Sequence, residues 1–226
     1  MAEQKESEIS ERTIVHNPRI DAVLDEISPR DKVLDIGCVQ HTAEKEGSED
    51  HWLHGELCEI SDSVLGLDYL EEEVEKLNER GYTAVCANAE SFELNEKFDI
   101  ITAGELIEHL SNPGEFVDRI RTHLRDNGKF ILTTPNPWYI RRFFEALILG
   151  DVHANSEHTC WFDRRTLHQV LERHGFNVQM FQYTKAPYFK RNLSLENIDA
   201  VLTRAIRQIG FNTLTGHSIV VIAEKL

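Results

Sequence analysis

Acidic and glycine residues follow two short apolar stretches of the chain, at points where strands of a buried sheet would end. Asp35 and Gly37 lie in Val-Leu-Asp-Ile-Gly-Cys, and Asp68 ends the next such stretch, Val-Leu-Gly-Leu-Asp. Glycine lets a ligand approach the backbone closely, and a carboxylate can accept hydrogen bonds from both hydroxyls of a ribose. Together these residues predict a site for a nucleoside cofactor.

Two later apolar stretches end in residues of the same kinds. Asn88 and Ala89 follow one of them, and Gly104 and Glu105 follow the other. In an open α/β sheet, ligands bind at the carboxyl ends of the strands, so all these residues would surround one ligand. The Gly-x-Gly-x-x-Gly pattern of dinucleotide sites is absent, and Asp68 follows the first turn by about thirty residues instead of about twenty. A nicotinamide-dependent dehydrogenase is therefore disfavoured.

Two histidines are candidates for acid–base chemistry. His109 lies in Glu-Leu-Ile-Glu-His-Leu, just after the fourth predicted strand, and His158 lies in a segment that follows the fifth. A histidine beside a reacting hydroxyl can remove its proton. His109 has the alternative of a structural role beside the sheet. For His158 there are also two interpretations: it faces the substrate, or its segment simply packs on the core through the neighbours Trp161 and Phe162.

Metal ligation is not indicated by the spacing of these residues. A zinc-hydrolase pattern places two histidines about one helical turn apart, whereas His153 and His158 flank Glu157 in a Gly- and Asn-containing stretch. We therefore expect no metal site. The cysteines are scattered without a Cys-x-x-Cys pair, which indicates neither a zinc ribbon nor a disulfide framework; they are Cys38, Cys58, Cys86 and Cys160.

The apolar stretches that carry these residues alternate with segments of helical periodicity. Each parallel return in a sheet needs a crossover long enough to hold a helix, so the alternation predicts a parallel sheet covered on both faces. We expect strands at 33–36, 64–67, 83–87, 98–103 and 129–133, helices at 18–27, 52–60, 71–80 and 113–124, then helices at 139–149, 164–174 and 195–209 and strands at 176–183 and 217–223.

Five segments in this order resemble the class I S-adenosylmethionine-dependent methyltransferases, especially the ubiquinone-biosynthesis-type O-methyltransferases and sugar-methyltransferase relatives. The resemblance covers roughly residues 30 to 137. It implies an α/β, Rossmann-like three-layer sandwich with a mostly parallel seven-stranded sheet and a small lid insertion after the fifth strand. The segments are VLDIGC (33–38), VLGLDYL (64–70), CANAE (86–90), FDIITAGELIEHL (98–110) and GKFILTTP (128–135).

The resemblance also implies a cofactor, S-adenosyl-L-methionine, and a role for each residue at a strand end. Asp35 and Gly37 would line its methionine part, and Asp68 would accept hydrogen bonds from the ribose hydroxyls. The adenine would meet a carboxamide that accepts from its amine and a backbone N–H that donates to a ring nitrogen. These adenine residues are Asn88 and Ala89, and the residues bordering the sulfonium are Gly104 and Glu105, whose carboxylate could orient the cation.

The chain departs from the family pattern directly after Cys38. Further glycines are usual there, but this chain continues with Val39, Gln40 and His41 and an acidic loop. The loop must take another path around the methionine carboxylate, and it supports the alternative of a noncatalytic cofactor-binding module on the same fold. We expect His54, farther along, to be a polar surface residue, whereas His41 could face the pocket or the solvent.

Length and charge restrict the organisation and the partners of the protein. The 226 residues suffice for one well-buried domain, which we place at 13–226 after a flexible 1–12, with 138–163 as the lid or substrate insertion. The formal charge of -15 opposes binding to nucleic acids. We find no signal peptide and no segment for stable membrane insertion, so we expect a cytoplasmic protein; its oligomeric state is open.

These observations converge on methyl transfer to a small molecule. The expected reaction is O-methylation of a glycan or a lipid-linked intermediate, with His109 and His158 as the candidate bases. Such a transfer is an in-line displacement in which the enzyme mainly aligns the donor and the acceptor.

Overall fold

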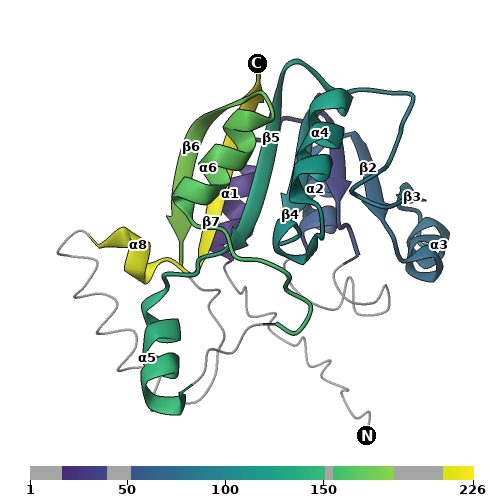
Figure 1. Ribbon diagram of the computed structural model, residues 1–226. Coiled ribbons are helices and arrows are strands. Elements are labelled where there is room, and N and C mark those ends of the chain that lie inside the picture. Colours follow the sequence, from purple (N-terminus) through teal and green to yellow (C-terminus); the bar gives the residue numbers. More distant parts are fainter. Residues whose placement is uncertain (1–16, 40–51, 151–154, 186–210) are drawn as a thin grey trace, which may run out of the picture.

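A seven-stranded sheet forms the centre of the protein, and helices cover both of its faces (Figure 1). The computed structural model describes residues 17–39, 52–150, 155–185 and 211–226. The predicted helix at 195–209, the predicted flexible N-terminus, His41 and His153 lie outside these residues. The strands are β1 (Lys32–Ile36), β2 (Ser63–Asp68), β3 (Ala84–Cys86), β4 (Phe98–Gly104), β5 (Leu124–Pro135), β6 (Phe176–Thr184) and β7 (Ser218–Lys225).

The order of the strands is β3-β2-β1-β4-β5-β7-β6. Neighbours among the first five are parallel, and β7 runs antiparallel to both β5 and β6. The mostly parallel, Rossmann-like sheet predicted from the sequence is thereby confirmed. The strand order reverses between β1 and β4, and the carboxyl ends of these two strands are where such sheets bind ligands.

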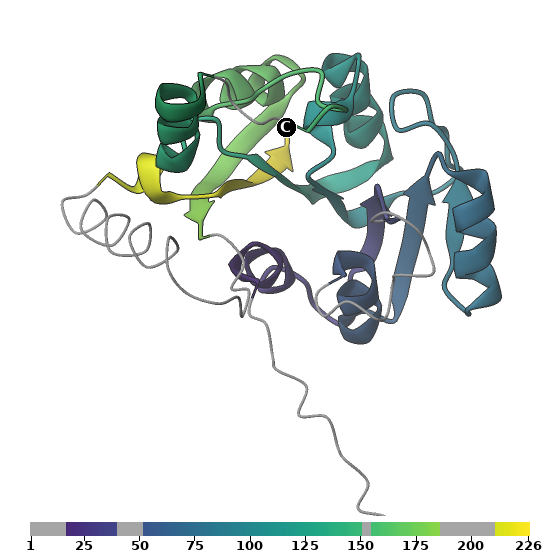
Figure 2. The same cartoon turned by 90° about the horizontal axis from the view of Figure 1, so that it is seen from below.

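The helices lie in two layers, which Figure 2 shows above and below the sheet. Helices α1 and α2 lie on one side, and α4 and α6 lie on the other. Among the described residues, no helix is both long enough and apolar enough to cross a membrane. The helices are α1 (Pro18–Leu24), α2 (Leu53–Ile60), α3 (Glu71–Glu79), η1 (Ile107–His109, a 3₁₀ turn), α4 (Pro113–His123), α5 (Ile140–Leu149), α6 (Arg164–Arg173) and α8 (Asn212–Thr215).

The core consists of three apolar clusters, and the two that contain the central strands lie on opposite faces of the sheet. Val33 and Ile100 belong to the cluster under α1, whereas their chain neighbours Leu34 and Ile101 belong to the cluster under α4 and α6. Successive side chains of a strand point to opposite faces, so a strand covered on both faces must be apolar at consecutive positions. This explains why the central strands are continuous apolar runs in the sequence.

The first helix is shorter than predicted. It begins at Pro18, where Oδ1 of Asn17 accepts a hydrogen bond from the backbone N–H of Arg19, but it ends at Leu24 instead of Ile27. The N–H of Ile27 donates to the carbonyl of Leu24, three residues back, so the last turn tightens and leaves the helix.

Strand β5 is longer than predicted: it starts at Leu124 instead of Lys129. The polar stretch between these residues is typical of a turn, and Asn127 has a left-handed backbone with φ of 61°. Leu124 nevertheless pairs with Phe98, and the register then shifts before Lys129 pairs with Ile100. The early part of the strand is therefore an irregularity that polarity alone does not reveal.

Gly66 in the middle of β2 leaves room for two side chains behind the strand. A Cβ at this position would lie 2.8 Å from Sγ of Cys38 and 2.9 Å from Cε1 of His54. We predict that Gly66→Ala lowers the free energy of unfolding by roughly 1–3 kcal/mol, because these buried groups must shift. Urea unfolding of the full chain measures this loss.

A double variant tests the stated cause. Replacing Cys38 with alanine removes one of the two clashing atoms, so the loss in the Gly66→Ala/Cys38→Ala protein should be smaller than the sum of the two single losses. Strictly additive losses would show that the contact with Cys38 is not the source of the strain.

Candidate active site

A cavity of about 830 Å³ opens at the carboxyl ends of β1, β2, β3 and β4. It lies at the point where the strand order reverses, as expected for a sheet of this kind. The structure brings the predicted cofactor-binding residues and the two candidate bases to this cavity. These residues are Asp35, Gly37, Asp68, Asn88, Ala89, Gly104, Glu105, His109 and His158.

The turn after β1 is built around a glycine and a buried carboxylate. Gly37 has φ of 79°, a conformation that side chains disfavour, and its N–H donates to the carbonyl of Leu67 at 2.8 Å. Asp35 is buried, and its carboxylate accepts a hydrogen bond of 2.7 Å from Oγ1 of Thr102 and lies 3.1 Å from Nδ1 of His54. Asp35 therefore fixes the turn from beneath, and Gly37 presents backbone to the cavity.

The prediction that His54 lies on the surface is wrong. Its side chain is 0% exposed, and its ring packs against Trp52 with ring centroids 5.4 Å apart. Burial opposes a charged imidazole, but the hydrogen bonds and charges of Asp35 and Cys58 outweigh this and raise the pKa of His54 to about 9. Leu57 lies one helical turn away and is also buried, and this spacing was the available signal for an inward-facing position.

Two backbone groups hold the carboxylate of Asp68 at the end of β2. The N–H of Val39 donates to Oδ2 at 3.1 Å, and the N–H of Leu70 donates to Oδ1 at 3.2 Å. Burial raises the pKa of Asp68, against the opposing effect of these N–H groups, and the charge of Asp35 adds to the rise. A carboxylate oxygen can accept more than one hydrogen bond, so the held group can still accept from a ligand in the cavity.

The residues after β3 form a tight turn at the rim of the cavity. Oδ1 of Asn88 accepts a hydrogen bond from the backbone N–H of Glu90 at 2.8 Å. The carboxylate of Glu90 in turn accepts from the N–H and from the side-chain amide of Asn112, just before α4. The amide oxygen of Asn88, expected to accept from an adenine amine, thus already accepts one hydrogen bond within the turn, and Ala89 stays at the cavity wall.

Glu105 is held in an unusual conformation after Gly104. Its φ of 51° is left-handed, and its N–H donates to the carbonyl and the hydroxyl of Thr133. Its carboxylate accepts a hydrogen bond of 2.7 Å from the hydroxyl of Ser218 and lies 3.8 Å from Nε of Arg19. The charge expected to orient a cationic cofactor is therefore shared with a guanidinium.

Arg19 lines the cavity but has no recognisable pattern in the sequence. It occupies the first turn of α1, and its Nη1 donates to the hydroxyl of Thr133 at 3.1 Å. Only the fold brings the start of α1 next to the end of β4, so no local sequence signal reveals the placement. The guanidinium is the cationic group that a carboxylate-bearing ligand would meet in this cavity.

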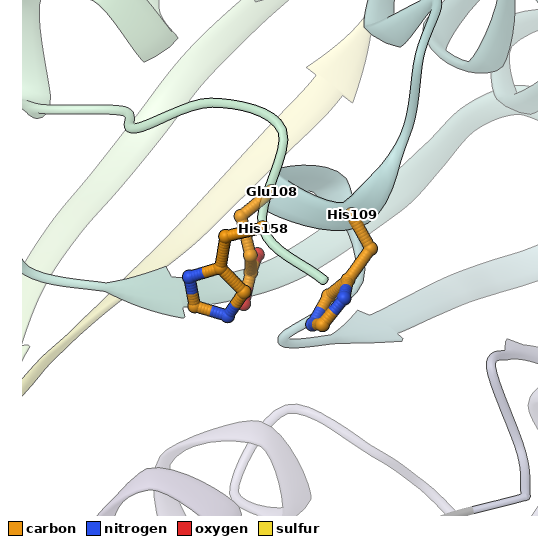
Figure 3. Close-up of side chains that lie close together, drawn as sticks. All are labelled: Glu108, His109 and His158. Atoms are coloured by element: carbon orange, nitrogen blue, oxygen red, sulfur yellow. The ribbon is translucent and has the colours of Figure 1, made fainter. Parts of the chain in front are cut away.

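Glu108, His109 and His158 form a cluster on another wall of the cavity (Figure 3). The first two belong to the 3₁₀ turn η1, and His158 comes from the segment before α6. The carbonyl of Glu108 accepts hydrogen bonds from the N–H groups of Thr159 and Cys160, at 2.8 and 3.3 Å. These bonds bring the two imidazole rings together, with centroids 4.6 Å apart and an interplanar angle of 86°.

Charge and burial perturb two members of this cluster. Burial and, secondarily, the charge of Glu105 raise the pKa of Glu108 to about 8. Its Oε2 accepts a hydrogen bond from the hydroxyl of Thr134 at 2.9 Å, so β5 holds this side chain in place. Burial, His109 and Arg142 lower the pKa of His158, which favours its neutral form.

A model of a methyltransferase domain matches residues 8–180, more than half of the 226 residues. The chain belongs to this methyltransferase family. S-adenosyl-L-methionine is the cofactor of the family, and a cavity at the strand ends with a held carboxylate after β2 suits its ribose.

Curated relatives match over part of their length. The chain is 30% identical over 133 residues to a ubiquinone biosynthesis O-methyltransferase from Nitrobacter winogradskyi, covering 54% of this chain and 44% of that protein. It is 27% identical over 108 residues to a malonyl-[acyl-carrier protein] O-methyltransferase from Haemophilus influenzae, covering 46% of this chain and 38% of that protein. The matches thus span about two fifths of the length of these relatives.

Solved structures match over nearly the whole chain and show the fold. A SAM-dependent methyltransferase from Archaeoglobus fulgidus has a TM-score of 0.61 at 19% identity, with 92% of this chain and 91% of that chain covered. The magnesium protoporphyrin IX methyltransferase of Synechocystis PCC 6803, solved with bound SAH, has a TM-score of 0.59 at 14% identity, with 92% and 82% covered.

The buried pair of His54 and Asp35 predicts a pH-dependent stability. The pKa of His54 is about 9 in the folded protein and 6.5 when unfolded, so its stabilising contribution is complete below pH 6.5 and is lost as the pH rises through 9. We expect the free energy of unfolding to fall by up to about 3 kcal/mol over this range, following the size of the pKa shift.

Urea unfolding at several pH values measures this loss, with two variants for comparison. The loss should be clearly smaller in His54→Gln, where only other groups such as Glu108, with its pKa of about 8, still titrate. It should persist in full in His168→Gln, which changes an exposed histidine of α6. An equal pH dependence in the wild type and His54→Gln would contradict the assignment.

Proposed function

We propose that the protein is an S-adenosyl-L-methionine-dependent methyltransferase that methylates an oxygen of a small molecule. The observation that carries this proposal is the arrangement of one cavity. A held carboxylate and a glycine turn lie on one side of it, and two imidazoles in contact lie on the other. The first side suits a nucleoside cofactor, and the second suits an acceptor that must lose a proton.

The cofactor would lie along the ends of β1, β2 and β3. Asp68 would accept the ribose hydroxyls, because its carboxylate is already oriented by two backbone N–H groups. Ala89 and the exposed ring of Tyr69 would enclose the adenine. The methionine part would pass Gly37, where Arg19 supplies a positive group for its carboxylate.

The reaction consists of one displacement and one proton transfer. The acceptor oxygen attacks the methyl carbon in line with the sulfur, the carbon–oxygen bond forms as the carbon–sulfur bond breaks, and S-adenosylhomocysteine leaves. The hydroxyl proton leaves toward the side of the cavity lined by His109 and His158. Neutral His158, with its lowered pKa, is in the protonation state that this step requires.

The surroundings of the imidazole pair favour an acceptor with an apolar part. His158 packs against Trp161, and the guanidinium of Arg142 lies over that indole at 4.5 Å. Arg142 belongs to α5, whose apolar side chains include Phe143 and Ile148, the latter 75% exposed. A lipid-linked intermediate would match this combination of an aromatic and cationic wall with a neighbouring apolar helix. A glycan, by contrast, would contact only the aromatic faces of this wall and not the apolar helix α5.

Binding of the cofactor tests the role of Asp68. We predict that Asp68→Ala weakens the binding of S-adenosylhomocysteine roughly 10- to 100-fold, because charge-assisted hydrogen bonds to the ribose are lost. Asp62→Ala, an exposed residue before the same strand, is the matched control and should bind like the wild type. Calorimetry measures both affinities, and an unchanged affinity in Asp68→Ala would remove Asp68 from the site.

Turnover separates an enzyme from a noncatalytic module. We expect transfer of labelled methyl groups to at least one member of a panel of lipid-linked intermediates, glycans, quinols and phenols. With that acceptor, His158→Ala should lower kcat about 100-fold or more while the affinity for S-adenosylhomocysteine stays unchanged, because proton transfer and not cofactor binding is affected. Cofactor binding without turnover on any acceptor would favour the module.

A further inference from the structure

Three side chains with the chemistry of metal ligands converge beside the cavity. One ligand atom from each of Glu108, His109 and His158 can be chosen so that all lie within 4.8 Å of one another. Figure 3 shows the three side chains close together, two from η1 and one from the segment that crosses it. Ligand atoms about 2.1 Å from a tetrahedral ion lie about 3.4 Å apart, so side-chain rotations that bring these atoms roughly 1 Å closer together would place them around an ion.

Two polar atoms of this cluster are buried without a partner. Glu108 is only 1% exposed, and its Oε1 accepts no hydrogen bond from any described residue. Nδ1 of His158 is buried and unpartnered in the same way. A buried carboxylate oxygen without a donor is costly, and such groups are normally paired, hydrogen-bonded or bound to a metal. The two atoms thus point to a ligand that the protein side chains do not supply.

We propose that Glu108, His109 and His158 bind one divalent transition-metal ion. Two imidazoles and one carboxylate suit zinc and the neighbouring ions of the first transition series. Sequence spacing predicted no metal site because it weighed His158 against His153 and Glu157. The cluster instead joins His158 to residues about fifty positions earlier in the chain, which only the folded structure brings near.

The groups around the cluster hold its members as outer-shell partners hold metal ligands. The hydroxyl of Thr134 donates to Oε2 of Glu108, which leaves Oε1 for the ion. The hydroxyl of Thr159 donates to the carbonyl of Glu108 at 3.1 Å and to that of Leu110 at 2.6 Å, which fixes the segment carrying His158. Ligands oriented by such hydrogen bonds bind metals more tightly than free side chains do.

The role of the ion rests on the proposed methyl transfer. Three protein ligands leave coordination positions open, and an acceptor hydroxyl bound there would lose its proton more easily. The proton would pass to water, the metal-bound oxygen would attack the methyl carbon, and S-adenosylhomocysteine would leave. His109 and His158 would then act by holding the ion and not as free bases. Under this proposal, the acceptor is a molecule whose reacting hydroxyl can coordinate a metal ion.

Zinc binding to the untagged full chain tests the site without any acceptor. Protein freed of metals with EDTA is titrated with zinc in competition with a chromogenic chelator. We expect one equivalent to bind, with the affinity reduced at least tenfold in Glu108→Gln and in His158→Ala. His168→Ala, on the outer surface of α6, is the matched control and should retain the wild-type affinity. Zinc affinity equal to that of the wild type in both cluster variants overturns the proposal, as does the absence of a bound equivalent.

Two further measurements distinguish failure of the metal site from failure of the proposed function. Cobalt bound at this site should show visible bands without thiolate charge transfer, because no cysteine is a ligand; intense thiolate bands would overturn the assignment. The affinity for S-adenosylhomocysteine should be the same with and without zinc. Cofactor binding and turnover in EDTA-treated protein would leave the methyltransferase proposal standing and overturn the metal. Zinc binding without binding of S-adenosylhomocysteine would leave the metal site standing and overturn the methyltransferase proposal.

Discussion

The buried carboxylate of Asp35 is the constraint on which the rest of the site depends. It accepts from the hydroxyl of Thr102 on β4 and pairs with His54 on α2, so it ties the two strands at the reversal point to the helix behind them. A charge in this position is tolerated because it is paired and hydrogen-bonded on both sides. The glycine turn that follows, and with it the wall of the cavity, is positioned by groups that do not face the ligand.

Beyond this pair, backbone groups fix most of the cavity. Two N–H groups orient Asp68, and the N–H and carbonyl groups of Glu105 and Thr133 couple the ends of β4 and β5. Because main-chain geometry follows from the sheet register, the positions of these groups are set once the strands have paired. The left-handed conformation of Glu105 is tolerated in the same way, since the hydrogen bonds to Thr133 and Ser218 over-determine it.

The sequence predicted the strands well, and its candidate site residues lie together at one cavity, for a physical reason. Buried parallel strands are continuous apolar runs, and their carboxyl ends share one edge, so Asp68 and Gly104 could be assigned to one site from local patterns. The buried position of His54 could not be predicted in this way, because it depends on the space left by Gly66 and on a carboxylate from another segment. The contact of His158 with His109 depends on main-chain hydrogen bonds between Thr159 and Glu108, which have no sequence signature. The bounds of α1 and β5 were missed because local turn geometry and irregular pairing set them.

The attachment of the segment before α6 has a consequence for how the acceptor side can change. Thr159 and Cys160 hold this segment to η1 through their own N–H groups, which every residue except proline possesses, and the hydroxyl of Thr159 is the one side chain that adds to this anchor among the contacts described above. Most of the side chains around His158 can therefore be exchanged without releasing the segment from the cavity. Relatives with this attachment could diverge in the molecules they accept while keeping the same walls for the cofactor, because the anchor and the selecting groups are chemically separate.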